Sequence, residues 1–599
     1  MENKKLKTRG EIDARFQWNL EALYATEDLW EQDAKKLEEM TQAFLRHRGH
    51  VADSAISLLT VMQESDELQR ILQNLYAYAH MRQDQDSAVS KYQEMQGRAM
   101  GMIAQTMAAT SFLTPELLCA DEETILGYLK EEPGLAQYDF ALRKILKTRP
   151  HVLTEVEESI LAQLTEVTEG AQGAFGMLNN ADLEFGFVDT AEGKVQLTQG
   201  NYIGMLQSYD RNVRQQAYTQ LYDTYKKHIN TIASLYNTSV KNDVITAKVR
   251  HYDSARQAAV KGNEIPEAVY DNLIDAVHQY LPVMHRYLDL RRKALGLEEL
   301  TMYDVYVPLV QIPEKEIPFE ECLSILNESL VPLGQDYLDK VNQGVQDGWI
   351  DIYENKGKRS GAYSGGSYDS YPYILLNYTG KLQDVLTTVH EMGHSMHSLY
   401  TRENQPITYG DYSIFVAEVA STVNECLLLH HLLGKDNEPE MEQYLVNRFL
   451  EEFRATVFRQ TMFAEFELAA HRYVESGGSL TPEWLCNEYQ RLNTLYYGPA
   501  VAQDDIIQYE WARIPHFYSA FYVYQYATGF SAATALSDKI LNEGPQAVAN
   551  YKKFLSMGSS DYPVNALKVA GVDMSQKEPV LRALEMFRSL VDRMEALLA

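Results

Sequence analysis

The sequence predicts a mainly α-helical protein. From about residue 27 to 180, apolar residues recur at helical spacing in long amphipathic runs, separated by short breaks. Pro266-Glu267 and Thr481-Pro482 are typical helix starts further along the chain. Two stretches, 183–199 and 356–380, depart from this pattern. No repeat of fixed period is present, so a solenoid is not supported.

The two exceptional stretches favour β-structure. Residues 183–199 alternate around Ala191-Glu192-Gly193, which predicts a hairpin and a candidate lobe boundary. In the second stretch, Ser360 to Ser367 is rich in glycine and serine and predicts a flexible turn, while Tyr371 to Tyr378 predicts a strand. This strand is interpreted either as part of a plain hairpin or as an exposed edge that holds an extended peptide.

Composition excludes several partners. The chain has 599 residues with a formal net charge of −30, which counts against nucleic acid and anionic membranes as partners. Its four cysteines, Cys119, Cys322, Cys426 and Cys486, form no C-x-x-C pair, so a reducing compartment is favoured. Met1 to Asp13 lacks an apolar signal core, and no apolar run is long enough to span a bilayer. We therefore expect a cytoplasmic protein.

The motif that carries chemistry is H-E-x-x-H at residues 390–394. The surrounding apolar spacing predicts a helix, with Thr379 as a candidate N-cap and Asp384 in the first turn. At about 100° per residue, His390 and His394 stand about 40° apart, one turn above the other, so both can bind one metal ion. Glu391 points about 100° away from His390 and can reach a metal-bound water without being a ligand.

Zinc that keeps an open position needs a third protein ligand. After a polar break from Thr401 to Tyr412, a second helix is predicted, and it offers Glu418. Glu425 lies two turns further on nearly the same face and can accept a ring N–H from a ligand histidine. The alternative is a chance match in an ordinary amphipathic helix, which we expect in roughly a few per cent of chains this long. A chance match explains neither the helical spacing of the surrounding apolar residues nor the following helix with its well-placed glutamate.

Two segments carry a family resemblance. They are His390-Glu391-Met392-Gly393-His394-Ser395-Met396-His397-Ser398 and Phe415-Val416-Ala417-Glu418-Val419-Ala420-Ser421. With the W-N-L-x-x-L-Y start at Trp18, they resemble oligoendopeptidase F, a bacterial branch of the thimet oligopeptidase group of zinc peptidases. A metzincin site would need glycine and histidine where the chain has His397 and Tyr400.

The resemblance implies a fold and a domain organisation. It implies a mainly α protein with two helical lobes that enclose a deep substrate channel, and a small β element beside the HExxH helix. We expect a flexible N-terminus at 1–14, an N-terminal helical lobe at 15–199 and a zinc metallopeptidase catalytic domain at 200–599. A buried site of this kind restricts the substrates to short peptides.

A tyrosine-rich segment follows His516. Helical spacing places Tyr522 and Tyr526 on one face, with Tyr518 below them. Such a stripe is commonly core packing. The resemblance implies instead a substrate-binding histidine and tyrosine set, in which His516 and a tyrosine donate to the developing oxyanion. The choice among Tyr522, Tyr524 and Tyr526 stays open.

The sequence therefore predicts a zinc-dependent oligoendopeptidase with one Zn²⁺ per chain. His390, His394 and Glu418 hold the metal, and Glu391 acts as general base on the zinc-bound water. Two alternatives remain: an exopeptidase on a similar helical scaffold, and a non-catalytic helical binding protein. Structural zinc normally has four protein ligands, and no fourth is evident here, which argues against the second. Cleavage specificity and oligomeric state are not predicted.

Overall fold

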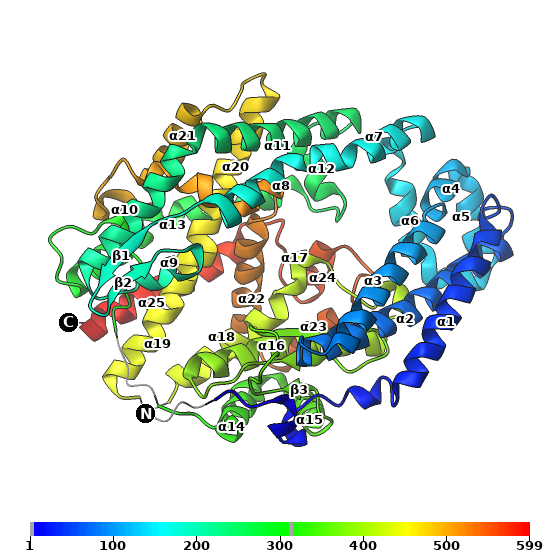
Figure 1. The fold of residues 1–599 in the computed structure, drawn as a ribbon, viewed down its shortest axis with the longest axis horizontal. Helices are drawn as coiled ribbons and strands as arrows, with labels where there is room; N and C mark the ends of the chain where they lie inside the picture. The colour runs from blue at the N-terminus through cyan, green and yellow to red at the C-terminus, as the bar shows by residue number, and fades with distance from the viewer. Residues whose placement is uncertain (1–4, 311–314, 436, 599) are drawn as a thin grey trace. The chain divides into compact units, whose positions relative to one another are not determined.

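Helices make up most of the chain in the computed structural model, which describes residues 5–310, 315–435 and 437–598 (Figure 1). The prediction of a mainly α fold is confirmed. The chain forms two compact units, each assembled from separate stretches of sequence. The first unit comprises Met1–Arg149, Glu314–Gly434 and Leu536–Val572, and the second comprises Pro150–Pro313, Lys435–Ala535 and Asp573–Ala599. The predicted division at residue 199 differs from these units and stays a prediction.

The first unit combines an N-terminal helical layer with a small sheet and the helices that follow it. Its helices are α1 (Glu27–Phe44), α2 (Ala55–Gln85), α3 (Ser90–Thr110), α4 (Leu113–Cys119), α5 (Glu122–Glu131), α6 (Asp139–Lys147), α14 (Phe319–Leu330), α15 (Gln335–Gln346), α16 (Leu382–Asn404), α17 (Ile414–Ala417), α18 (Val419–Leu433), α23 (Pro545–Leu555) and α24 (Pro563–Val569). Its strands are β3 (Ile350–Asp351), β4 (Tyr363–Gly365) and β5 (Tyr373–Leu375).

The three strands form one sheet in the order β3-β5-β4. β5 pairs in parallel with β3 and antiparallel with β4, so β4 lies at an edge. Strand β4 falls inside the segment predicted as a flexible turn, and that prediction is wrong for Tyr363–Gly365: these residues pair with β5 and are half-buried. The predicted strand 371–378 is present but shorter, from Tyr373 to Leu375.

The N-terminal segment is tied to this sheet. Arg9–Glu11 form a 3₁₀ turn, and Arg9 Nη1 donates to the buried Asp351 Oδ1 at 2.8 Å. The Trp18 indole N–H donates to the Ile374 carbonyl at 2.7 Å. An ion pair to a buried carboxylate therefore anchors the second half of the stretch 1–14, whose flexibility stays a prediction.

The metal helix predicted from the motif is α16. It begins after Lys381 rather than after Thr379, so the predicted N-cap is wrong. Asp384 explains the difference, since its Oδ2 accepts from the backbone N–H of both Thr379 and Lys381, at 2.8 and 3.0 Å. These bonds hold Thr379 outside the helix while Asp384 occupies the first turn, where a negative charge is favourable.

The second unit contains long helices and one hairpin. Its helices are α7 (Glu155–Thr168), α8 (Gly170–Met177), α9 (Gln199–Leu206), α10 (Arg211–Lys227), α11 (Ile229–Val249), α12 (Ala255–Lys261), α13 (Glu267–Ala294), α19 (Pro439–Glu452), α20 (Arg459–Glu475), α21 (Pro482–Tyr497), α22 (Tyr524–Asn542, whose last residues belong to the first unit) and α25 (Glu578–Leu598).

The hairpin and the two helix starts predicted in this unit are present. β1 (Phe187–Thr190) and β2 (Gly193–Gln196) form the predicted hairpin. The predicted helix starts are confirmed at α13, which follows Pro266, and at α21, where the Thr481 hydroxyl accepts from the Trp484 N–H. The interior is rich in buried tyrosines, and the hydroxyl of Tyr270, for example, donates to the Ala464 carbonyl at 2.6 Å.

Candidate metal centre

Two histidines of α16 point their Nε2 atoms at one another. The opposite face of the helix is apolar, and Val385, Val389 and Met392 on it are fully buried. This burial fixes the rotation of the helix, so His390 and His394 lie one turn apart on the other face. Their Nε2 atoms are 3.2 Å apart.

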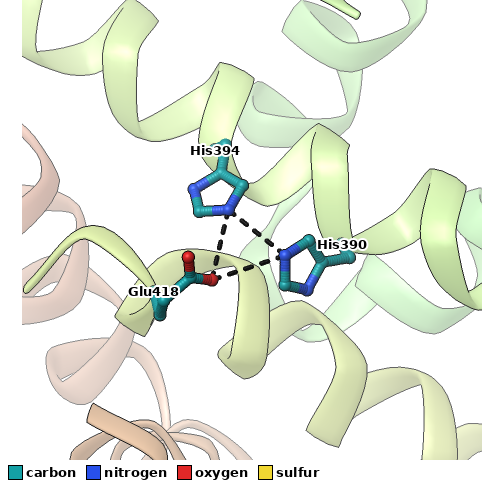
Figure 2. A group of neighbouring side chains, drawn as sticks. All are labelled: His390, His394 and Glu418. Carbon is teal, nitrogen blue, oxygen red and sulfur yellow. Dashed lines mark hydrogen bonds and ion pairs between the residues drawn. The ribbon is translucent and has the colours of Figure 1, made fainter. Parts of the chain in front are cut away.

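A third side chain near these histidines comes from the junction between the next two helices. Glu418 lies at the junction of α17 and α18, and its carboxylate reaches both histidines (Figure 2). Its Oε2 is 3.4 Å from His390 Nε2 and 3.3 Å from His394 Nε2. The sequence prediction placed these three side chains together, and the structure brings them together as a group suited to a metal ion.

Close packing of α16 on α18 allows Glu418 to reach the histidines. The contact is made at Gly393, the residue before His394. A Cβ atom on Gly393 would lie 2.5 Å from Ser421 Cα and 2.7 Å from the Ala420 carbonyl oxygen. No side chain fits there without a shift of backbone. Asn424 also joins the two helices, because its side-chain N–H donates to the Val389 carbonyl at 3.2 Å.

The geometry of the three ligand atoms fits a tetrahedral metal ion. Bonds of 2.0–2.2 Å place the ligands of a tetrahedral centre about 3.3–3.6 Å apart. The three sides of the triangle formed by His390, His394 and Glu418 are 3.2, 3.3 and 3.4 Å long. Three protein ligands also leave a position for water, as in catalytic rather than structural zinc sites.

The electrostatics of the group favour a cation. Burial lowers the pKa of the His390 imidazole, but Glu418 and Glu425 outweigh burial and raise that pKa to about 10. Burial likewise opposes ionisation of Glu418, and the two histidines outweigh it and lower the pKa of its carboxyl. The carboxylates thus stabilise positive charge at this point, and a divalent cation bound by neutral imidazoles meets the same requirement.

Glu425 orients one of the histidines. His390 Nδ1 lies 3.1 Å from Glu425 Oε1, so the ring donates its Nδ1–H to the carboxylate. This contact leaves the Nε2 lone pair of His390 directed at the group. The sequence prediction that Glu425 accepts a ring N–H from a ligand histidine agrees with this geometry.

Glu391 is buried beside the edge strand. Its residue surface is 7% exposed, and burial raises the pKa of its carboxyl while His390 and His394 lower that pKa. The backbone N–H of Ser364 in β4 also lowers it. Glu391 is therefore a carboxyl group held next to the candidate metal-binding group of His390, His394 and Glu418 and is not part of it.

Sequence reasoning missed the connection between β4 and α16. Ser364 Oγ lies 2.8 Å from Ser395 Oγ, and Ser395 is fully buried one helical turn after Glu391. The four-residue spacing between Glu391 and Ser395 is the signal that could have indicated a shared face. Nothing in the glycine- and serine-rich segment around Ser364 indicated that it forms a strand.

The second unit brings together another set of predicted residues. Tyr526 OH is 3.4 Å from Tyr522 OH and 3.5 Å from His516 Nε2. Burial and the nearby Arg459 lower the pKa of His516, which favours its neutral form. We call His516, Tyr522 and Tyr526 the donor group, because each carries an N–H or O–H.

The arrangement of the donor group differs from the prediction in one respect. The prediction that Tyr522 and Tyr526 share a helical face is wrong, because helix α22 begins at Tyr524. Tyr522 reaches Tyr526 because the chain turns at Phe521, which has a positive φ of 55°. Tyr524 is 2% exposed and packs on Tyr270, and Tyr518 is stacked on Phe175, so neither belongs to the donor group.

A mainly helical chain with this site belongs to a definite class of protein. Two histidines one turn apart, a glutamate between them and a third ligand from a following helix define an HExxH metallopeptidase. The model of peptidase family M3 matches residues 204–586, and the model described as Oligopeptidase F matches residues 116–185. The chain belongs to peptidase family M3, in its oligoendopeptidase F branch.

Relatives and solved structures agree with this assignment. The chain is 45% identical to oligopeptidase PepF of Bacillus subtilis over 99% of its length and 89% of the relative's. It is 44% identical to group B oligopeptidase PepB of Streptococcus agalactiae, over 99% and 98% of the two chains. The crystal structure of oligoendopeptidase-F from Enterococcus faecium superposes with a TM-score of 0.74 at 38% identity, covering 95% and 99% of the two chains.

The protein is therefore a metalloendopeptidase, a hydrolase of peptide bonds, as the sequence predicted. Its metal dependence agrees with the His390, His394 and Glu418 group. None of the helices in the described ranges combines the length and the apolar character needed to cross a bilayer.

Proposed function

We propose that the protein is a zinc-dependent oligoendopeptidase that hydrolyses internal bonds of short peptides. His390, His394 and Glu418 hold one Zn²⁺, and Glu425 orients His390. The observation that carries the proposal is the triangle of ligand atoms with sides of 3.2–3.4 Å, with the buried Glu391 beside it. Zinc at three such ligands supplies a Lewis acid that lowers the pKa of water and polarises a carbonyl.

Glu391 handles the protons in this proposal. Its carboxyl takes a proton from the attacking water and gives it to the leaving amine. Burial supports this role, because a carboxyl with a raised pKa accepts a proton more readily than an exposed one. Ser364 and Ser395 hold the neighbouring strand against the helix, which keeps the carboxyl in place.

The edge of β4 is the proposed place for the peptide backbone. β4 is the last strand of its sheet, and its outer edge pairs with no other strand in the described part of the chain. An extended peptide can add to such an edge through backbone hydrogen bonds. Ser364 lies in this strand and also contacts Glu391, so a peptide paired there runs past the general base.

The donor group is proposed to stabilise the oxyanion that forms when water attacks the peptide carbonyl. Its support is chemical: the Tyr526 hydroxyl lies 3.4 Å from the Tyr522 hydroxyl and 3.5 Å from His516 Nε2, in a cluster where His516 is exposed and both tyrosines are half-buried. Donors aimed at charge that develops in the transition state lower the barrier without tightening substrate binding.

We also propose a cytoplasmic location. No disulfide links the four cysteines in the described part of the chain, and Cys119 is exposed, which suits a reducing compartment.

The test is cleavage of a peptide pool blocked at both ends, followed by mass spectrometry. We expect internal cleavage, its loss with a chelator, its return with zinc, and about one zinc per chain by elemental analysis. His394→Ala should lose both metal and activity, whereas His430→Ala, an exposed histidine on α18, should keep them. Full zinc in the His394 variant contradicts the ligand assignment. An intact blocked pool, together with terminal cleavage of the same peptides left unblocked, identifies an exopeptidase.

A further inference from the structure

Glu467 is a buried acid that the proposed mechanism does not use. It lies on α20 of the second unit and is 0% exposed. Its Oε1 accepts a hydrogen bond from the backbone N–H of Phe521 at 2.7 Å. Its Oε2 is buried and has no hydrogen-bond partner in the described chain. Burial of a carboxyl group that is only partly hydrogen-bonded is unfavourable for folding. The hydrogen bond from Phe521 therefore offers a reason for the presence of Glu467 at this position.

The contact is made to a strained turn. Phe521 has φ of 55°, and it is one of three non-glycine residues with positive φ among the described residues. An L-residue with a side chain this large rarely adopts that conformation without support from its surroundings. The Phe521 ring is 3% exposed and packs on His471 and Tyr270, with ring centroids 4.6 and 5.8 Å away. The hydrogen bond from its N–H to Glu467 is the polar part of that support.

The turn determines where Tyr522 lies. Tyr522 follows Phe521 directly and lies two residues before Tyr524, the first residue of α22. A regular helix through 522 would place this ring differently, whereas the turn brings its hydroxyl to 3.4 Å from Tyr526 OH. The Tyr522 and His516 rings are also parallel, with centroids 6.0 Å apart.

We infer that Glu467 is a positioning residue: by accepting the Phe521 N–H, its carboxyl fixes the turn that places the Tyr522 hydroxyl in the donor group. The inference rests on the proposed oxyanion role of the donor group. Glu467 itself is buried against the backbone and touches no reacting atom.

A glutamine is the matched replacement at this position. Burial raises the pKa of Glu467 to about 8, so the carboxyl is mainly neutral at pH 7. Glutamine keeps its size, its charge and an oxygen acceptor for the Phe521 N–H. Methionine has similar length but no comparable acceptor, so Glu467→Met removes the hydrogen bond and avoids a large cavity.

The experiment compares kcat and KM for both variants, each made with Tyr522 present and in a Tyr522→Phe background. Glu467→Met should lower kcat about tenfold or more and leave KM within about threefold. Glu467→Gln should restore most of kcat. In the Tyr522→Phe background, Glu467→Met should cost less than about twofold, because its effect acts through the missing hydroxyl.

Glu465→Met on the same helix is the control. Glu465 accepts hydrogen bonds from Tyr496 OH and His278 at 2.9 and 2.7 Å, so its loss lowers thermal stability without touching the turn. A fall in kcat equal to that of Glu467→Met would make the effect a general loss of packing and overturn the inference. Equal losses for Glu467→Gln and Glu467→Met overturn it too, as does an undiminished effect of Glu467→Met in the Tyr522→Phe background.

A spectroscopic measurement separates this inference from the proposed function. With 3-fluorotyrosine in place of Tyr522, the fluorine resonance should shift in Glu467→Met and stay near its original position in Glu467→Gln. An unchanged resonance in Glu467→Met overturns the positioning role. If Tyr522→Phe alone keeps normal kcat, the oxyanion role of Tyr522 fails, and the fluorine resonance still decides whether Glu467 positions this ring.

Discussion

The metal group and the donor group show two different ways of assembling a site. His390 and His394 come from one regular helix and Glu418 from the start of the helix packed on it, and the contact of these helices at Gly393 brings the ligand atoms within 3.4 Å of one another. The donor group depends instead on a turn with a strained Phe521, and the Tyr526 hydroxyl lies 3.4 Å from Tyr522 OH and 3.5 Å from His516 Nε2. A site on packed helices follows from helical spacing, whereas a site on a turn depends on distant residues that hold the turn.

The largest effect is expected next to the metal group. Glu391→Gln keeps the shape of the side chain and removes the base, so we expect kcat to fall about 10³–10⁴-fold with zinc retained. Metal content and steady-state kinetics of the purified variant check this. Near-normal turnover would mean that another group handles the proton. The comparison on α16 would then concern metal binding alone.

The donor group is tested by removing single hydroxyls. Tyr526→Phe or Tyr522→Phe should lower kcat about 10²–10³-fold with KM little changed, because the donor acts on charge present mainly in the transition state. Tyr524→Phe is the internal control, since Tyr524 is 2% exposed and lies in the core. Kinetics and thermal unfolding of the three variants separate the two roles. Normal kcat in both Tyr522 and Tyr526 variants would leave the oxyanion to His516 or to zinc alone.

The same contrast explains what could be predicted from the sequence. Helical spacing predicted that His390 and His394 share a face, and a two-turn spacing linked Glu418 to Glu425, because α-helix geometry is regular. Tyr522 was placed on a helix that begins only at Tyr524, because local spacing does not reveal that Glu467 holds a turn 54 residues away in sequence.

Strand β4 was missed for a related reason. Of its three residues, Tyr363 to Gly365, Tyr363 alone favours a strand, and the segment lies among glycines and serines. Pairing with β5 and the hydroxyl contact from Ser364 to Ser395 determine its structure, and Ser395 lies 31 residues away in sequence. Tertiary contacts therefore overrode local preference at the strand that contacts Glu391.

A smaller effect is expected from Glu425. Glu425→Gln weakens the acceptor for the His390 Nδ1–H and removes a negative charge, so zinc affinity should fall about 10- to 100-fold rather than vanish. Competition with a chelator of known affinity measures the change. Unchanged zinc affinity would mean that the packing of the helices alone orients His390. The metal group would then differ still more from the donor group, which depends on residues that hold a turn.

The smallest effect tests the helix contact itself. In an exposed helix, replacing glycine by alanine favours folding by about 1 kcal/mol, because alanine loses less conformational entropy. At Gly393 the new Cβ would lie 2.5 Å from Ser421 Cα, so the backbones of α16 and α18 must separate. Overpacking of this kind costs about 1–3 kcal/mol, which exceeds the gain in helix propensity. Gly393→Ala should therefore unfold at lower denaturant concentration. Gly101→Ala on α3 should be neutral or more stable, because no atom beyond the chain neighbours and the backbone of its own helix lies within 4 Å of the added Cβ. Equal stability changes in the two variants would show that the close approach at Gly393 is not what holds Glu418 against the histidines.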